Sequence, residues 1–387
     1  MKSMYRVMLP FILLIFYCHL ALAKAPANSP LWQFKINAGL WSPADIHGSV
    51  MYFGADDGIF YAFDVNTQKT LWTFTSKGLI RSAALLEGNT VYFASDDGNL
   101  YALNSKTGKE KWRYFLGEHS RRLPARNGPY DYDYLHSSPV YHKGVIYIGA
   151  SSGLVHALRA DTGKALWTFA TKASVRASPL IHKGRLYIGS WDGRLYALKA
   201  SNGEQLWSFD TGGIIQDTAA VCAGNIYFGS RSTHFYALNS KTGEERWRYT
   251  HKNGSWAESS PVCHKKQVIV GSSDAQTLFV FNAKSGNLDW SFKTKGWSWG
   301  TPALIDSSIF IGAISASQYT FEGLPIHSGF FALGLKGELL WHYKPEPIEL
   351  GYLSGGVFNP AIKYKNTLIV MAIDGTISAF AHEGNNI

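Results

Sequence analysis

The sequence predicts an all-β fold: an eight-bladed β-propeller of four-stranded antiparallel blades, closed by the N-terminal strand. Three observations predict it: a recurring tryptophan motif, four strand-like runs in each repeat, and a last repeat that lacks one run. A fixed period near 40 residues with one aromatic anchor per unit is typical of propellers and other repeat folds. The anchors lie at intervals of 40, 40, 55, 40, 40, 43 and 51 residues and are Trp32, Trp72, Trp112, Trp167, Trp207, Trp247, Trp290 and Trp341.

Each repeat predicts one blade, as the copy at residues 137–171 shows. It holds four short runs rich in Val, Ile, Tyr, Trp and Ala, separated by turns that contain Gly144, Gly153 and Gly163. Glycine supplies the positive φ that tight hairpins need, so the four runs form an up-and-down sheet. Such a sheet cannot bury both faces alone, so neighbouring blades must stack. We therefore interpret the recurring tryptophans as inter-blade anchors and not as ligand contacts.

The two ends of the chain predict how the ring closes. Residues 356–380 supply three more strand-like runs and then stop without a tryptophan motif, whereas the chain opens with the isolated run LWQFKI from Leu31. If the N-terminal run completes the last blade, two exposed sheet edges disappear together. This arrangement predicts eight blades, with the ring closed by the N-terminal strand.

Residues 1–23 are expected to be a secretory signal peptide, followed by a single propeller domain over residues 24–387. Lys2 and Arg6 precede an apolar stretch, Val7–Leu22, which ends in a small-x-small cleavage pattern at Ala23. Cys18 lacks the surrounding pattern of a lipoprotein site, which favours soluble export over a lipid anchor. We expect a periplasmic or secreted protein that is a monomer and has no transmembrane segment after cleavage.

The two remaining cysteines, Cys222 and Cys263, occupy the same position in consecutive repeats. A disulfide is conceivable in an oxidising compartment, but equivalent positions in adjacent blades need not meet the Cα separation of under about 7 Å that a bridge requires. Two buried free thiols are therefore the favoured expectation, with a disulfide as the alternative.

The chain is basic, with a formal net charge of +9. For an exported protein, this charge points to anionic partners such as acidic headgroups, a polyanionic saccharide or an acidic protein face. Because the chain is expected to be exported, nucleic acid is not expected as a partner. The alternative is a basic surface that is simply solvated.

Three insertions predict a functional face. The interval from the tryptophan to the Pro of the next first strand is 12 residues for Trp167–Pro179 but 27 for Trp112–Pro139 and 19 for Trp341–Pro360, and extra residues also lie around Ile314–Ser328. In a propeller, all three emerge on one face, and loops that exceed the repeat minimum commonly carry binding. The longest insertion holds a candidate partner-binding cluster: Arg121, Arg122 and Arg126.

The same face contains the mouth of the axial channel. In each repeat a Pro or Ala marks the first strand, and counting three residues back from it predicts a rim of Leu40, Arg81, His136, Arg176, Gln216, Glu258, Trp299 and Val357. The six candidate residues for binding a partner or a small anionic or sugar-like ligand are Arg81, His136, Arg176, Gln216, Glu258 and Trp299. We expect Arg81, His136 and Arg176 to bind a small anion or an acidic partner side chain, and His136 to have a lowered pKa when that site is empty. The alternative is a water-filled funnel. No catalytic motif (Gly-x-Ser-x-Gly, P-loop or His-Glu-x-x-His) and no metal motif is present.

The repeats at Gly144–Thr171 and Gly184–Thr211 resemble the pyrroloquinoline-quinone (PQQ) repeat, and the likeness covers roughly residues 31–381. The resemblance implies an eight-bladed propeller of one of two kinds. One kind comprises the quinoprotein dehydrogenases, which hold PQQ and Ca²⁺ on the axis; the other comprises non-catalytic scaffolds of the BamB type, which act in outer-membrane protein assembly.

The residues favour the scaffold. The adjacent cysteine pair and the Cys-x-x-Cys-His haem site of the enzymes are missing, and the carboxylates Asp217 and Glu258, with Asn359, form no local Ca²⁺ motif. We therefore expect an exported, non-catalytic envelope scaffold without a cofactor. The alternative is a PQQ- and Ca²⁺-dependent alcohol or sugar dehydrogenase.

Overall fold

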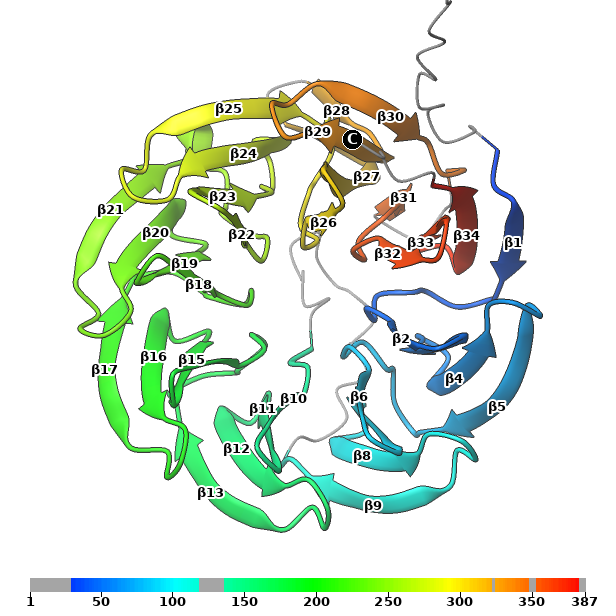
Figure 1. The fold of residues 1–387 in the computed structure, drawn as a ribbon. Coiled ribbons are helices and arrows are strands. Elements are labelled where there is room, and N and C mark those ends of the chain that lie inside the picture. The colour runs from blue at the N-terminus through cyan, green and yellow to red at the C-terminus, as the bar shows by residue number, and fades with distance from the viewer. Residues whose placement is uncertain (1–28, 118–135, 322–323, 348–352, 383–387) are drawn as a thin grey trace, which may run out of the picture.

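A computed structural model describes residues 29–117, 136–321, 324–347 and 353–382. Eight antiparallel sheets stand around a central axis, with the first strand of each blade innermost and the last at the circumference (Figure 1). The predicted eight-bladed propeller is confirmed. Within the described residues, the only helix is the short 3-10 turn η1 (Lys252–Gly254), and none of the described helices is long and apolar enough to span a bilayer.

The first four blades repeat one strand pattern with little variation. Blade 1 contains β2 (Asp45–His47), β3 (Val50–Gly54), β4 (Ile59–Asp64) and β5 (Lys69–Thr75). Blade 2 contains β6 (Leu85–Glu87), β7 (Thr90–Ala94), β8 (Asn99–Asn104) and β9 (Glu110–Phe115). Blade 3 contains β10 (Val140–His142), β11 (Val145–Gly149), β12 (Leu154–Arg159) and β13 (Ala165–Ala170). Blade 4 contains β14 (Leu180–His182), β15 (Arg185–Gly189), β16 (Arg194–Lys199) and β17 (Gln205–Asp210).

The remaining blades include the two departures from the pattern, in blades 7 and 8. Blade 5 contains β18 (Ala220–Cys222), β19 (Asn225–Gly229), β20 (His234–Asn239) and β21 (Glu245–Thr250). Blade 6 contains β22 (Val262–His264), β23 (Gln267–Val270), β24 (Thr277–Asn282) and β25 (Leu288–Lys293). Blade 7 contains β26 (Ala303–Ile305), β27 (Ser308–Phe321), β29 (Gly329–Gly334) and β30 (Leu339–Tyr343), and blade 8 contains β32 (Ile362–Tyr364), β33 (Thr367–Met371), β34 (Thr376–Ala381) and β1 (Trp32–Lys35).

The recurring tryptophans pack one blade against the next. The Trp72 indole nitrogen donates a hydrogen bond to the Ser105 carbonyl of blade 2 at 3.0 Å, and a Cβ added at Gly108 would lie only 2.6 Å from the Trp72 ring. The turn glycine is therefore required twice: for its φ of +69° and for room beside the indole. Equivalent indole-to-carbonyl bonds of 3.1 Å join Trp112 to Ala160, Trp167 to Ala200, Trp247 to Ala283 and Trp290 to Leu335.

The ring is closed as the sequence predicts. β1 pairs antiparallel with β34, with Trp32 opposite Ala379 and Lys35 opposite Thr376. The Lys35 ammonium lies 2.7 Å from the Asp374 carboxylate at the end of this pairing. Beyond β1, Ile36 and Leu40 are buried in the apolar cluster between blades 8 and 1. The closing strand thus contributes both sheet hydrogen bonds and core packing.

The favoured expectation of two free thiols is wrong. Cys222 and Cys263 form a disulfide between the first strands of blades 5 and 6, with their Cα atoms 6.3 Å apart. First strands are the innermost strands, where neighbouring blades converge most closely, and β18 and β22 are in contact. That convergence brings equivalent positions within bridging distance.

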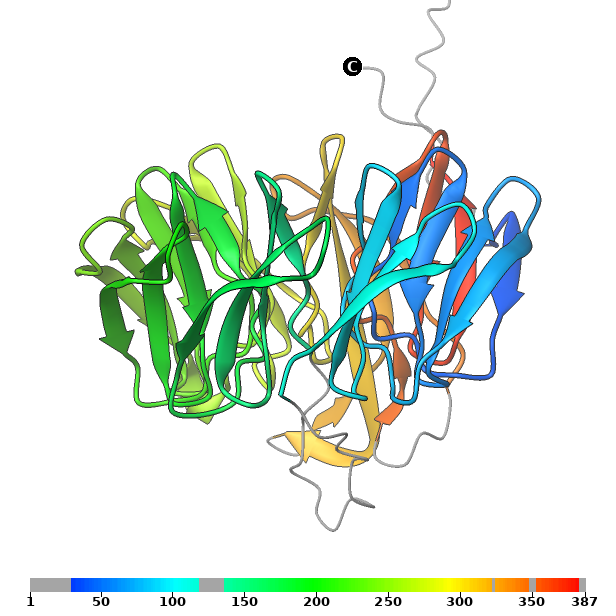
Figure 2. The ribbon, with the colours of Figure 1, turned by 90° about the horizontal axis from the view of Figure 1, so that it is seen from below.

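Blade 7 carries the largest departure from the repeat. β27 runs for 14 residues, against five for β33 in blade 8, and it pairs beyond the blade with β28 (Leu324–Ile326) and β31 (Leu353–Gly356). We call these two strands and residues 314–321 of β27 the platform. Figure 2 shows it projecting from one face of the propeller.

Candidate functional site

The platform lies on the face where the blade-to-blade connections and the hairpins between second and third strands emerge; we call it the insertion face. Around the axis at this face, each blade contributes one residue just before its first strand, and we call these residues the axial ring. The ring consists of Trp41, Arg81, His136, Arg176, Gln216, Glu258, Trp299 and Phe358. All eight side chains are buried, with exposed fractions below 9%.

Two members of the predicted rim, Leu40 and Val357, are wrong by one residue. A Cβ at Gly149 would meet Val175, which precedes ring residue Arg176, and a Cβ at Gly312 would likewise meet Val357. Val357 is therefore the residue before the ring, and the ring position of blade 8 is Phe358. In blade 1, the Ser42 hydroxyl accepts a hydrogen bond from the Gly54 nitrogen, just as the Ser137 hydroxyl of blade 3 accepts one from the Gly149 nitrogen. Since Ser137 follows the ring residue His136, the equivalent ring residue in blade 1 is Trp41, which precedes Ser42. The landmark prolines Pro43 and Pro360 stand one position earlier than those of the other blades.

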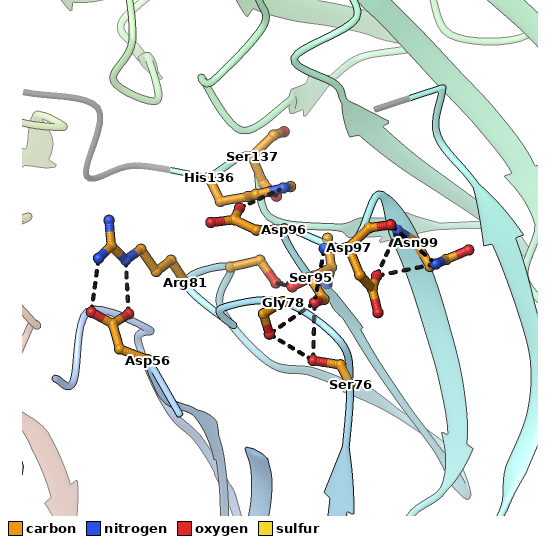
Figure 3. Close-up of polar contacts among 12 residues, drawn as sticks. Asp56, Ser76, Gly78, Arg81, Ser95, Asp96, Asp97, Asn99, His136 and Ser137 are labelled. Carbon is orange, nitrogen blue, oxygen red and sulfur yellow. Dashed lines mark hydrogen bonds and ion pairs between the residues drawn. The ribbon is translucent and has the colours of Figure 1, made fainter. Parts of the chain in front are cut away.

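Arg81 is held by a carboxylate from the preceding blade. Its guanidinium donates two hydrogen bonds, each 2.8 Å, to the two oxygens of Asp56, which follows strand β3 in the second hairpin of blade 1 (Figure 3). The same guanidinium lies 5.7 Å from the centre of the Trp41 ring. A bidentate pair of this kind fixes both partners, so Arg81 ties blade 2 to blade 1.

His136 repeats the arrangement one blade further on. Its Nδ1 lies 3.0 Å from the Ser137 carbonyl, and its Nε2 lies 3.7 Å from a carboxylate oxygen of Asp96. Asp96 occupies the same hairpin position in blade 2 that Asp56 occupies in blade 1. Figure 3 shows Asp96 beside the imidazole.

Between blades 5 and 6 the polarity is reversed. Here the hairpin residue is the cation, Arg231, and the ring residue is the carboxylate, Glu258; the two form a close, buried ion pair. Gln216 donates a hydrogen bond to Glu258 at 2.7 Å and accepts one from Arg231 at 3.3 Å. The Arg231 guanidinium also lies 4.5 Å from the centre of the Trp256 ring. Of the six predicted site residues, Gln216 and Glu258 are brought into direct contact.

The remaining sector is aromatic and supports the platform. Trp297 and Trp299 are stacked with ring centres 4.7 Å apart, and the Trp297 indole donates a 2.7 Å hydrogen bond to Asp274. The backbone of Trp297 bridges to Ile314 of β27. The cluster that joins the ring to the platform contains Trp41, Trp297, Trp299, Ile314, Ala316, Ile326, Leu353, Phe358 and Ile373.

At three junctions a hairpin residue of one blade lies against a ring residue of the next blade that can carry the opposite charge: Asp56 with Arg81, Asp96 with His136, and Arg231 with Glu258. The Arg81 guanidinium and the His136 imidazole face the carboxylates of Asp56 and Asp96, so the retention of these two residues does not require a bound anion. Because both side chains are buried and bridge two blades, they also contribute to the packing between blades. Arg176 is equally buried, and Arg121, Arg122 and Arg126 lie outside the described residues.

Asp217 is a buried carboxyl group that the ring does not neutralise directly. It stands at the position where Ser137 and Ser259 bond to neighbouring backbone, and it accepts a hydrogen bond from the Ser259 nitrogen. Burial raises the pKa of Asp217 well above its usual range; the nearby Glu258 carboxylate raises it further, and Arg231 opposes the shift. Burial also raises the pKa of Glu258, against the effect of Arg231.

These directions predict how stability depends on pH. A carboxyl group whose pKa is raised by folding contributes stability that is complete below its unfolded pKa and is lost as the pH rises through its folded pKa. Asp217→Asn keeps the shape and the acceptor but cannot ionise, so we expect its melting temperature to exceed that of the parent at mildly alkaline pH and to match it in acid. Because the pKa of Glu258 is also raised, the stability of the variant should still decrease with rising pH, but less steeply than that of the parent. A difference in melting temperature between variant and parent that stays constant across the whole pH range would contradict this assignment.

The oxygen atoms named for Ca²⁺ do not fit that ion. Glu258 is engaged by Arg231 and Gln216, Asp217 favours its protonated form, and Asn359 uses its amide nitrogen to donate to the Leu40 carbonyl at 2.9 Å. Calcium sites gather six to eight oxygen ligands with net negative charge. Among the described residues, no group of three or more His, Cys, Asp or Glu side chains is placed to hold a metal.

Sequence reasoning missed Asp56, Asp96 and Arg231, although each carries a signal. Each lies two residues after the end of the second strand of its repeat, and at these three junctions its charge is opposite to the charge that the next ring residue can carry. Only a comparison of consecutive repeats reveals this complementarity, because the two residues of each pair belong to different blades.

Comparison with known proteins gives a consistent fold. A family model described as "Outer membrane protein assembly factor BamB" matches residues 19–131, 123–221 and 211–311. The crystal structure of BamB from Moraxella catarrhalis has a TM-score of 0.69 at 17% identity, over 93% of this chain and 99% of that one. Quinohemoprotein alcohol dehydrogenase from Comamonas testosteroni has a TM-score of 0.67 at 14% identity, over 91% and 76%. The crystal structure of Saccharomyces cerevisiae Sqt1 has a TM-score of 0.71 at 12% identity, over 92% of this chain and 99% of that one. A comparison with curated protein sequences finds no match.

Proposed function

The chain belongs to the BamB-like family of PQQ-repeat propellers, and we propose that it is an exported, non-catalytic scaffold that binds a protein partner in the cell envelope. Outer-membrane protein assembly is the process that we propose for it, since the matching family model and BamB itself share this architecture. The expected signal peptide at residues 1–23 supports export to the periplasm or beyond.

The observation that carries the proposal is the platform on the insertion face. Seven blades keep four short strands, whereas blade 7 extends β27 and adds β28 and β31 beyond the blade. The extension rests on the aromatic sector of the ring, so it is anchored to the rigid core. A surface element built on a rigid scaffold is where binding is most often placed.

We propose that the polar ring sector contributes to the same surface. Arg121, Arg122 and Arg126 belong to the connection that precedes blade 3 and lie outside the described residues. We expect these arginines, together with Arg81, His136 and Arg176, to favour an acidic side chain or a small anion of the partner, although Asp56 and Asp96 already face Arg81 and His136. Gln216, Glu258 and Trp299 complete the proposed set around the axis.

We propose that this function uses no quinone and no metal. The oxygen atoms nearest the axis are committed to Arg231, Gln216 and backbone partners. Incubation with PQQ and Ca²⁺ is expected to give no stoichiometric quinone absorbance and no dye reduction with alcohols or sugars. Tight quinone binding with substrate-dependent dye reduction would instead establish the dehydrogenase alternative.

A shortened platform tests the partner surface. Ala316 and Ile326 are paired across β27 and β28, so replacing residues 317–325 by Asn-Gly leaves a two-residue hairpin and keeps the bridge from Trp297 to Ile314. We expect this variant to recover at least tenfold less partner than the parent in pull-downs from envelope extract. A second variant shortens residues 118–133.

The matched control changes a turn on the opposite face. Lys143→Asn creates the same Asn-Gly turn between β10 and β11, far from the insertion face, and should leave partner recovery unchanged. Recovery of the same partner in the same amount by the parent and by both shortened variants would overturn the assignment of the partner surface.

A further inference from the structure

The face opposite the insertion face carries a ring of lysines at the tips of the innermost hairpins. We propose that this ring is a docking surface for a phosphate-bearing bilayer. The lysine crown consists of Lys143, Lys183, Lys265, Lys266 and Lys365, which belong to the first hairpins of blades 3, 4, 6 and 8. All five side chains are exposed.

The backbone at the crown does not favour lysine. Lys143, Lys183, Lys265 and Lys365 have φ values of 50°, 50°, 52° and 51°. This left-handed conformation suits Gly, Asn or Asp and is unfavourable for a long side chain. The turn chemistry therefore gives no reason for lysine at four equivalent positions, whereas an exposed cation at the tip of a hairpin is well placed to contact an external surface.

Few carboxylates of the protein compensate the positive charge of the crown. Among the described residues, no carboxylate forms an ion pair with Lys143, Lys183, Lys265 or Lys266. In the other first hairpins, Asp306 is already engaged by Lys363 at 2.7 Å and by His382 at 2.9 Å, which leaves Glu87 as the exposed acidic group. The ion pairs of the axial ring lie on the other face and do not reach these ammonium groups.

The chain enters the described part of the propeller on the same face. β1 begins at Trp32, opposite Ala379 near the end of β34, and runs toward the hairpin that precedes Thr376 on the insertion face. The chain therefore enters the propeller from the crown side. Residues preceding β1 include the apolar stretch Val7–Leu22. An apolar segment that precedes the entry point favours a membrane on the crown side over one on the insertion face.

The form of the crown favours a bilayer over an acidic protein. Its charges are single ammonium groups on flexible stems, spread over several blades. Such a spread suits many shallow contacts with a planar anionic surface, each lysine contributing roughly a fivefold change in association near that surface. A specific interface with a protein partner usually contains bidentate arginine–carboxylate pairs or an apolar side chain at the centre of the interface.

The experiment measures co-sedimentation of the mature protein with vesicles of phosphatidylglycerol and phosphatidylethanolamine, and with neutral phosphatidylcholine vesicles. The crown variant carries Lys143→Asn, Lys183→Asn, Lys265→Asn and Lys266→Asn. Asparagine suits the left-handed conformation of the first three positions, and the fourth is an exposed turn residue, so the fold should be kept. The control removes the same charge from exposed lysines of the insertion face by Lys77→Asn, Lys172→Asn, Lys252→Asn and Lys295→Asn.

We expect binding to anionic vesicles that weakens with salt, a loss of at least tenfold in the crown variant and a change within about twofold in the control. Equal loss in both variants, or no binding of the parent to anionic vesicles, would overturn the proposal. Binding of poly-glutamate through the crown without vesicle binding would overturn it in favour of an acidic protein. The partner pull-down concerns the opposite face, so either proposal can fail without the other.

Discussion

Deleting residues 24–40 from the mature chain is expected to lower the free energy of unfolding by more than about 4 kcal/mol. The deletion removes β1, leaves the edge of β34 without a partner, and takes Trp32, Ile36 and Leu40 out of the cluster between blades 8 and 1. A truncation of this kind combines loss of core packing with an exposed sheet edge, so aggregation should accompany it.

The matched control for this deletion is removal of residues 24–30, which stops before β1 pairs with β34. Urea unfolding of the three proteins provides the comparison. We expect the short deletion to unfold at the same urea concentration as the parent. If the long deletion also has the parent's free energy of unfolding, closure by the N-terminal strand does not hold the ring.

Replacing Arg231 by Ala is expected to cost about 3–5 kcal/mol, because it leaves the Glu258 carboxylate buried without its cation. The loss of the contact with Trp256 adds to the cost. Since the raised pKa of Glu258 must rise further without Arg231, the penalty should shrink in acid, where the carboxyl group is protonated.

Two further variants isolate this pair. Glu258→Gln combined with Arg231→Ala should recover a large part of the lost stability, since no buried charge remains. Arg194→Ala breaks an exposed ion pair with Asp210 and should change stability by less than about 1 kcal/mol. A cost for Arg231→Ala no greater than that for Arg194→Ala would show that the ring pair does not hold blades 5 and 6 together.

The parts of the fold that sequence predicts well are those that repeat. Trp72 and Trp112 mark the period, the turn glycines mark the hairpins, and the isolated run at Leu31 completes the last blade. These signals work because each blade is one local unit whose strands pair with their neighbours in sequence.

Features that join different blades were harder to predict. The disulfide between Cys222 and Cys263 depends on how closely the innermost strands converge, which the pattern within a repeat does not contain. The same holds for the pairing of Asp56 with Arg81. The rim was displaced by one residue at two blades because Pro43 and Pro360 do not stand where the other landmark prolines do.

The central claim is that the insertion face binds a protein partner, and site-specific photo-crosslinking in the living envelope tests it most directly. A photoreactive residue is placed in turn at Lys77, Lys172 and Lys295 of the insertion face, and at Lys106 and Lys241 of the opposite face; all five side chains are exposed. We expect a discrete protein adduct from the insertion face and none from Lys106 or Lys241. Protein adducts that form only from Lys106 or Lys241, or an absence of adducts from all three insertion-face positions, would contradict the account.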